Sequence, residues 1–296
     1  MSAISKKPSG SMTWEHGMRH LEVNGTTVSY TTKGSGKGLV LLHGTHADGA
    51  SAFGQLSPRF SDRRTVVVPD YAGCGASTVP EGELSLDLLV EQVAAVVGSA
   101  TAQPVDLVGV SLGAVVAAAV AARHPGLVRR LVLVAGWVDG TDSRHQLVCE
   151  TWRRLAAADP ELGVRFALSV AFSPPYLSAL GTDKLSSLIS RAAPDGIGHR
   201  IGLCLRADLR DHLSGISAPT LVVGLRHDHL IPVESSRRLH RLIAGSSYAE
   251  IDSGHVVTLE RPDAFVSQVR DFLFSGADSA ASEGADAVST DGASGG

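Results

Sequence analysis

Cysteine and long apolar runs are both scarce in this sequence of 296 residues. The three cysteines, Cys74, Cys149 and Cys204, lie far apart and form no Cys-x-x-Cys or Cys/His ligand spacing, so neither a disulfide framework nor a zinc site is predicted. The richest apolar stretch, residues 112–122, is mostly alanine and falls short of the roughly 20 residues that span a bilayer. The first residues also lack the apolar core of a secretory signal. We therefore expect a cytoplasmic protein that contacts no membrane.

An excess of positive charge is also missing. The formal net charge is −4, and residues 275–296 hold four acidic side chains and no lysine or arginine, so the rest of the chain is formally neutral. A neutral body lacks the basic surface that nucleic acid requires, and no nucleic-acid partner is expected. The Ala/Gly/Ser/Asp composition of residues 275–296 predicts a disordered acidic tail, and the polar residues 1–18 predict a flexible N-terminus.

Short apolar runs alternate with helical patterns along most of the chain. Continuous apolar runs are typical of strands that are buried on both faces of a parallel sheet, and they occur at residues 39–42, 65–68, 105–110, 130–135 and 219–224. Asn24-Gly25 is a strong hairpin signal between two further strands, at residues 21–23 and 26–32. This alternation predicts the α/β class, with a mostly parallel sheet flanked by helices and an antiparallel hairpin at one edge.

The alternation stops after residue 136 and resumes near residue 216. Between these points the sequence reads as helices and loops, which predicts a helical cap or lid over residues 137–215. The core would then consist of residues 19–136 and 216–274. Because α/β sheets bind ligands at the carboxyl ends of their strands, we expect the cap to lie over that edge.

A Gly-x-Ser-x-Gly motif, Gly109-Val110-Ser111-Leu112-Gly113, follows one predicted strand and opens a predicted helix. Such a sharp turn requires a strained, positive-φ backbone at Ser111, and the two glycines remove side chains that would collide there. The hydroxyl of Ser111 would then stand exposed beside the N-terminus of the helix, whose dipole favours a developing negative charge.

With this motif the chain resembles the α/β-hydrolase superfamily over about residues 20–274, and four other motifs fall where that family has them. They are His43-Gly44-Thr45 after a strand, the Gly-rich loop at residues 70–77, the acid loop at residues 224–232 and Ser253-Gly254-His255. The resemblance implies an eight-stranded sheet with a helical cap. It also implies that the loop beginning at Asp70 is structural.

The resemblance assigns the chemistry to three residues in the family's order. Ser111 would be the nucleophile, His255 the general base, and Asp228 the acid that orients the imidazole. The backbone N–H groups of Thr45 and Leu112 would form the oxyanion hole. Asp139 is the alternative acid, because it follows the strand at residues 130–135, where some family members place it.

A serine at the turn indicates acyl transfer. We expect a carboxylic ester hydrolase-like enzyme that cleaves an ester, lactone, thioester, amide or activated C–C bond of a small, largely apolar substrate. The tentative pocket residues are His46, Trp137, Phe172 and Tyr176. Neither a metal nor an organic cofactor is needed, and we expect a monomer or homodimer. The alternatives are a triad-bearing lyase, cyclase or cofactor-free oxygenase, and a ligand-binding receptor with vestigial turnover.

Overall fold

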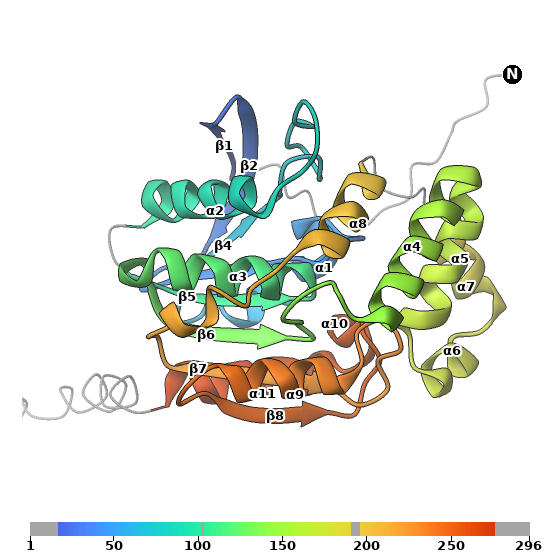
Figure 1. Ribbon diagram of the computed structural model, residues 1–296. Coiled ribbons are helices and arrows are strands. Elements are labelled where there is room, and N and C mark those ends of the chain that lie inside the picture. Colours follow the sequence, from blue (N-terminus) through green and yellow to red (C-terminus); the bar gives the residue numbers. More distant parts are fainter. Residues whose placement is uncertain (1–16, 102–103, 191–195, 276–296) are drawn as a thin grey trace, which may run out of the picture.

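The molecule is built on one sheet of eight strands, in the order β1-β2-β4-β3-β5-β6-β7-β8 (Figure 1). This computed structural model describes residues 17–101, 104–190 and 196–275. The strands β1 and β2 pair in antiparallel fashion with their neighbours, whereas every other neighbouring pair is parallel. The predicted eight-stranded, mostly parallel sheet is therefore confirmed. The strands are β1 (Met18–Val23), β2 (Thr26–Lys33), β3 (Gly38–Leu42), β4 (Thr65–Pro69), β5 (Val105–Val110), β6 (Val128–Val134), β7 (Thr220–Leu225) and β8 (Ser247–Ile251).

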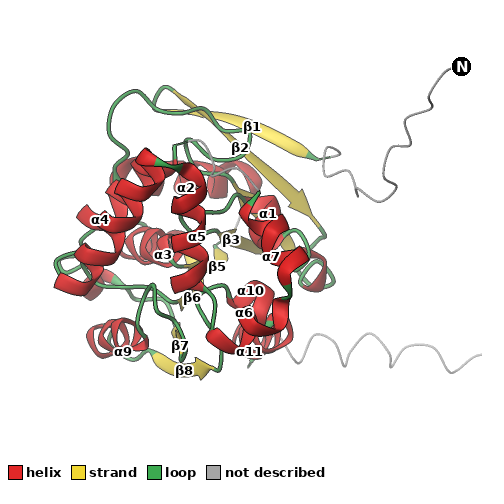
Figure 2. Ribbon diagram, turned by 90° about the vertical axis from the view of Figure 1, so that its right-hand side faces the viewer, coloured by secondary structure: helices red, strands yellow, loops and turns green. Residues whose placement is uncertain are grey.

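Helices cover both faces of the sheet. Figure 2 shows α2, α3 and α9 on one side of the strands and α1 and α11 on the other. Two apolar clusters fill the space between the layers, and Leu239 of α9 belongs to one of them while Phe265 of α11 belongs to the other. These helices are α1 (Gly49–Phe53), α2 (Leu86–Ala100), α3 (Leu112–Arg123), α9 (Val233–Leu242) and α11 (Pro262–Phe274), and the short α10 (Val257–Glu260) precedes α11.

Strand β3 shows why the central strands read as unbroken apolar runs. All five of its residues are buried. Val40 and Leu42 belong to the cluster under α2 and α3, whereas Leu39 and Leu41 belong to the cluster under α1 and α11. Because successive side chains point to opposite faces and both faces are covered, every position must be apolar.

The opening hairpin turns at Asn24 and Gly25, both of which have positive φ, 48° and 77°. Strand β1 begins at Met18, earlier than the strand predicted at residues 21–23. The exposed outer face of β1 explains the difference, because its polar residues carry no burial signal. Apart from residues 17, 18 and 275, the predicted flexible N-terminus and the predicted acidic tail lie outside the described residues.

Between β6 and β7, leaving out residues 191–195, the described chain forms five α-helices: α4 (Ser143–Ala158), α5 (Pro160–Ala171), α6 (Pro174–Leu180), α7 (Thr182–Ile189) and α8 (Ile197–Arg206). In Figure 1, α4 to α7 lie beyond the ends to which the arrows of β6 and β8 point. Helix α4 packs against both α5 and α8. The boundaries of the cap at residues 137 and 215 stay a prediction. Within the described parts of the chain, no helix combines the length and hydropathy that a membrane span requires.

The turn from β5 into α3 places Ser111 at φ 60° and ψ −123°. A Cβ atom on Gly109 would lie 2.1 Å from the carbonyl oxygen of Gly113. A Cβ atom on Gly113 would lie 2.1 Å from the carbonyl oxygen of Leu42 in β3. The two glycines therefore let α3 start directly against the sheet, and the positive φ predicted for Ser111 is confirmed.

We predict that Gly113→Ala lowers the free energy of unfolding by about 3 kcal/mol, because the new methyl group meets backbone oxygens that cannot move aside. Gly98→Ala in α2 is the matched control. Its Cβ would meet nothing within 4 Å, so this substitution should stabilise the protein by roughly 0.5–1 kcal/mol. Urea unfolding measures the change in the free energy of unfolding for each variant, which should be a loss for Gly113→Ala and a gain for Gly98→Ala. Equal stabilities of the two variants would contradict the packing argument.

Candidate active site

Three loops bring Ser111, Asp228 and His255 together at the carboxyl edge of the sheet. Ser111 follows β5, Asp228 follows β7 and His255 follows β8. The hydroxyl oxygen of Ser111 lies 2.9 Å from Nε2 of His255, and Nδ1 of His255 lies 2.6 Å from Oδ2 of Asp228. All three side chains are buried. A continuous hydrogen-bond chain thus runs from the carboxylate through the imidazole to the hydroxyl.

The carboxylate of Asp228 is fixed by its own loop. Its second oxygen, Oδ1, accepts hydrogen bonds from the N–H groups of Leu230 and Ile231, at 2.9 and 2.8 Å. These bonds leave Oδ2 free to face His255. The backbone N–H of His255 donates to the carbonyl of Ala171, at the end of α5, at 2.6 Å. The imidazole is therefore held from both the core and the cap.

The predicted oxyanion donors flank Ser111. Leu112 is the first residue of α3, and the first N–H groups of a helix have no acceptor within it. The loop of Thr45 reaches the same place, because a Cβ atom on Gly44 would lie 3.2 Å from Cβ of Ser111. Nδ1 of His43 lies 2.9 Å from the carbonyl oxygen of Gly44 and, as its donor, would fix the peptide that carries the Thr45 N–H.

A cavity of about 380 Å³ opens onto Ser111 and His255. Its walls are mainly apolar and come from both the core and the cap. The cap supplies seven of the lining residues: Trp152, Val164, Ala167, Leu168, Ala171, Phe172 and Leu188. A cavity of this size and lining is suited to a small organic ligand.

Comparison with known proteins fixes the family. The family model described as the alpha/beta hydrolase fold matches residues 38–262. This chain belongs to the α/β-hydrolase family. Since its named relatives are hydrolases, it is a hydrolase.

Three similar proteins illustrate the range of this family. The chain is 37% identical over 262 residues to pyrrolizixenacetamide deacetylase of Xenorhabdus hominickii, with 87% of this chain and 98% of the relative covered. It is 28% identical to 2-hydroxy-6-oxo-2,4-heptadienoate hydrolase of Pseudomonas putida, with 81% and 90% covered. The crystal structure of the enol-lactonase from Burkholderia xenovorans LB400 superposes with a TM-score of 0.76 at 25% identity, covering 86% of this chain and 99% of that one.

Two of the four predicted pocket residues of this hydrolase line the cavity, namely His46 and Phe172. Trp137 does not: it is buried in the core cluster, where its ring packs 5.2 Å from that of His145. Tyr176 is also absent from the cavity wall, and its ring stacks on that of Phe172 with the centroids 5.1 Å apart. These two residues therefore do not line this cavity, because the direction of a cap side chain depends on helix packing, and their role in substrate binding stays a prediction.

Trp152 is a wall residue that the sequence prediction missed. It lies on α4 and stacks against His46 with ring centroids 6.1 Å apart. A signal was present, because the three buried residues of α4, His145, Cys149 and Trp152, follow one another at helical spacing and so share a face.

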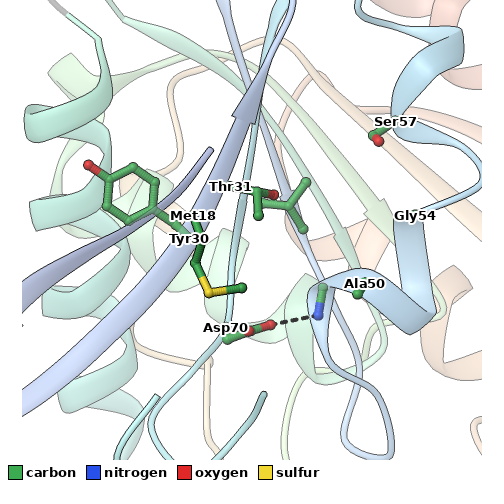
Figure 3. A pocket seen from close by; sticks show the side chains of 9 residues that line it. Met18, Tyr30, Thr31, Ala50, Gly54, Ser57 and Asp70 are labelled. Atoms are coloured by element: carbon green, nitrogen blue, oxygen red, sulfur yellow. Dashed lines mark hydrogen bonds between the residues drawn. The ribbon is translucent and has the colours of Figure 1, made fainter. Parts of the chain in front are cut away.

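Asp70 serves the structure of a neighbouring loop. Its Oδ1 accepts a hydrogen bond from the N–H of Gly49 at 2.7 Å, beside a hollow of about 40 Å³ that has room for only a few waters (Figure 3). A Cβ atom on Gly75 would lie 2.0 Å from Oδ2 of Asp70. Burial raises the pKa of Asp70 to about 6. These contacts tie the Gly-rich loop to the start of α1 and leave no space for a substrate.

The alternative acid, Asp139, has different partners. Its carboxylate accepts hydrogen bonds from the hydroxyl and N–H of Thr141 and pairs with Arg238 at 2.7 Å. Burial acts to raise the pKa of Asp139, but the bonds from Thr141 and Arg238 outweigh it and hold the pKa below its usual value. The residue that contacts His255 is Asp228. In the described residues, no group of three or more His, Cys, Asp or Glu side chains is placed to hold a metal ion.

We predict that Asp228→Asn lowers kcat by about 10⁴-fold, because the amide favours the wrong tautomer of His255. Asp139→Asn should leave kcat within a few-fold of the parent, because this substitution removes the ion pair with Arg238 and not a contact with His255. Steady-state turnover of 4-nitrophenyl acetate measures both. A larger loss in the Asp139 variant would move the acid to the end of β6.

Proposed function

We propose that this chain is a serine hydrolase that acts through an acyl-enzyme on Ser111. The observation that carries the proposal is the hydrogen-bond chain from Asp228 through His255 to Ser111, which ends at the floor of the apolar cavity. A serine hydroxyl is a weak nucleophile until a base takes its proton, and His255 is within reach to do so. The same contact lets the imidazolium return the proton to the leaving group.

The reaction would proceed in two stages, acylation of Ser111 and hydrolysis of the acyl-enzyme. The Ser111 oxygen bonds to the substrate carbonyl carbon while its proton passes to Nε2 of His255. The tetrahedral oxyanion accepts hydrogen bonds from the N–H groups of Thr45 and Leu112, and Asp228 stabilises the imidazolium. As the bond to the leaving group breaks, that group takes the proton from His255. A water molecule then attacks the acyl carbon while its proton passes to His255. The bond from that carbon to the Ser111 oxygen breaks, His255 returns the proton to this oxygen, and the acid is released.

The substrate we propose is a small, largely apolar ester, lactone or amide. The mainly apolar cavity supports this class, since its polar groups gather near Ser111 and at the start of α1. The relative at 37% identity is named a deacetylase, which favours a short acyl group on the Ser111 side. Cap residues Trp152 and Phe172 would contact the apolar parts of the substrate, including any acyl chain longer than acetyl.

We predict that Ser111→Ala lowers kcat by several orders of magnitude without loss of fold, because only the attacking atom is removed. A fluorophosphonate probe should add one label per wild-type chain and none to the variant, as measured by intact mass. Labelling of the wild type together with no turnover on a panel of acetyl esters and acetamides would favour the receptor alternative. Retention of more than a few per cent of turnover by the variant would exclude Ser111 as the nucleophile.

We predict that Phe172→Ala changes the preference among acyl chain lengths by about 10-fold, because each methylene that an apolar pocket gains or loses is worth ~1–3 kcal/mol. Phe166→Ala is the matched control. Phe166 is also a cap phenylalanine, but it packs on the core cluster and does not line the cavity, so its loss should affect all esters alike. Values of kcat/KM for a series from acetyl to octanoyl esters test this, and a uniform loss in both variants would contradict the role of the cap wall.

A further inference from the structure

The last cap helix, α8, reaches the proposed oxyanion donor with two buried side chains. Arg200 is only 1% exposed, and its Nε donates to the carbonyl oxygen of Thr45 at 2.7 Å. Its Nη1 donates to the carbonyl oxygen of Gly73 in the Gly-rich loop at 2.5 Å. One guanidinium therefore joins the cap to two core loops that are far apart in the sequence.

Cys204 lies one turn later on the same face of α8. Its Sγ is 3.1 Å from the hydroxyl oxygen of Thr45, and both atoms are buried. Burial raises the pKa of Cys204 to about 11, so the group is a neutral thiol near pH 7. Arg200 thus contacts the backbone carbonyl of Thr45 and Cys204 contacts its hydroxyl. The two residues are four apart on one helix and so lie on the same face.

Side chains hold both peptides that flank Thr45, in the loop that contains this residue. The loop runs between β3 and α1, and the backbone bond within it, from the Ala47 N–H to the Gly44 carbonyl, is long at 3.4 Å. His43 lies against the peptide before Thr45, and Arg200 holds the peptide after it. With both flanking peptides fixed, the two backbone dihedrals of Thr45 are fixed, and so is the direction of its N–H.

We infer that Arg200 and Cys204 are positioning residues for the oxyanion hole, so that the cap takes part in the chemistry as well as in substrate selection. The inference rests on the proposed serine hydrolase mechanism. An oxyanion donor must be held within about 0.5 Å of its working position, and removal of such a donor costs ~10²–10³ in kcat. Lysine cannot replace Arg200, because one ammonium group lacks the planar fork that reaches two carbonyl oxygens at once.

The test compares substrate turnover with binding of an inhibitor that forms an oxyanion. An alkyl trifluoromethyl ketone adds to Ser111, with the serine proton passing to His255 and the carbonyl oxygen becoming the oxyanion. Arg200→Lys should lower kcat/KM for 4-nitrophenyl acetate by about 10- to 100-fold with little change in KM, and should raise the inhibition constant of the ketone by the same factor. A purely structural role would lower the melting temperature and leave that constant unchanged.

Arg206→Lys is the matched control on the same helix. Arg206 is exposed and donates to the carbonyl oxygen of Leu84 at 3.2 Å, away from Ser111. Its substitution should therefore leave kcat/KM and the inhibition constant of the ketone unchanged. If Arg200→Lys fails to fold, the Cys204 variants test whether α8 positions the oxyanion donor. Cys204→Ala should weaken turnover and ketone binding in parallel by a few-fold, and Cys204→Ser, which keeps a hydrogen-bonding group beside Thr45, should restore both.

The outcomes separate this inference from the proposed function. If the ketone inhibits the wild type but binds the Arg200 and Cys204 variants equally well, the positioning role is wrong and the serine mechanism stands. If the ketone does not inhibit the wild type, or Ser111→Ala still turns over substrate, the serine mechanism itself is wrong.

Discussion

The positive φ of Ser111 is the constraint around which the site is arranged. A side chain at this backbone position is strained, and the strain is tolerated only because the surrounding contacts determine the turn. Gly109 and Gly113 permit α3 to begin against the carbonyl oxygens of β3 and of the turn itself. That close approach sets the hydroxyl of Ser111 beside both the first N–H of α3 and the loop at Gly44. Widening of the turn would move the hydroxyl of Ser111 away from His255.

The cap and the core meet through polar contacts as well as apolar ones. Between α5 and α6, the carbonyl of Ala171 accepts a hydrogen bond from the N–H of His255. Next to it, the carboxylate of Glu260 accepts hydrogen bonds from Ser173 and from the N–H of Gly254. In α8, Arg200 and Cys204 both contact Thr45. Such buried polar contacts are costly to break because each leaves an unsatisfied group. They couple the position of the cap to the geometry of the loops that carry Ser111's partners.

Sequence patterns identified the three side chains that meet at the carboxyl edge of the sheet better than they identified the walls of the cavity. Ser111, Asp228 and His255 each follow a strand of the parallel part of the sheet, and parallel strands bring their carboxyl ends to one edge. Trp137 also follows a strand, yet its ring turns into the core beside His145. Phe172 and Tyr176 are four residues apart and stack on each other, but only Phe172 borders the cavity. Which aromatic side chain borders the cavity depends on how the cap helices pack together.

The sequence by itself determined the sheet, the sharp turn at Ser111 and the loops that follow each strand. It could do so because two-sided burial and the absence of Cβ atoms leave local, readable patterns at residues such as Gly109 and Gly113. The motifs favoured Asp228 over Asp139, and the tertiary structure shows Asp228 in contact with His255. Only the tertiary structure showed that Arg200 reaches Thr45 and that Trp152 reaches His46. Those pairs join residues far apart in the chain, and their meeting depends on helix packing and side-chain direction, which no local pattern encodes.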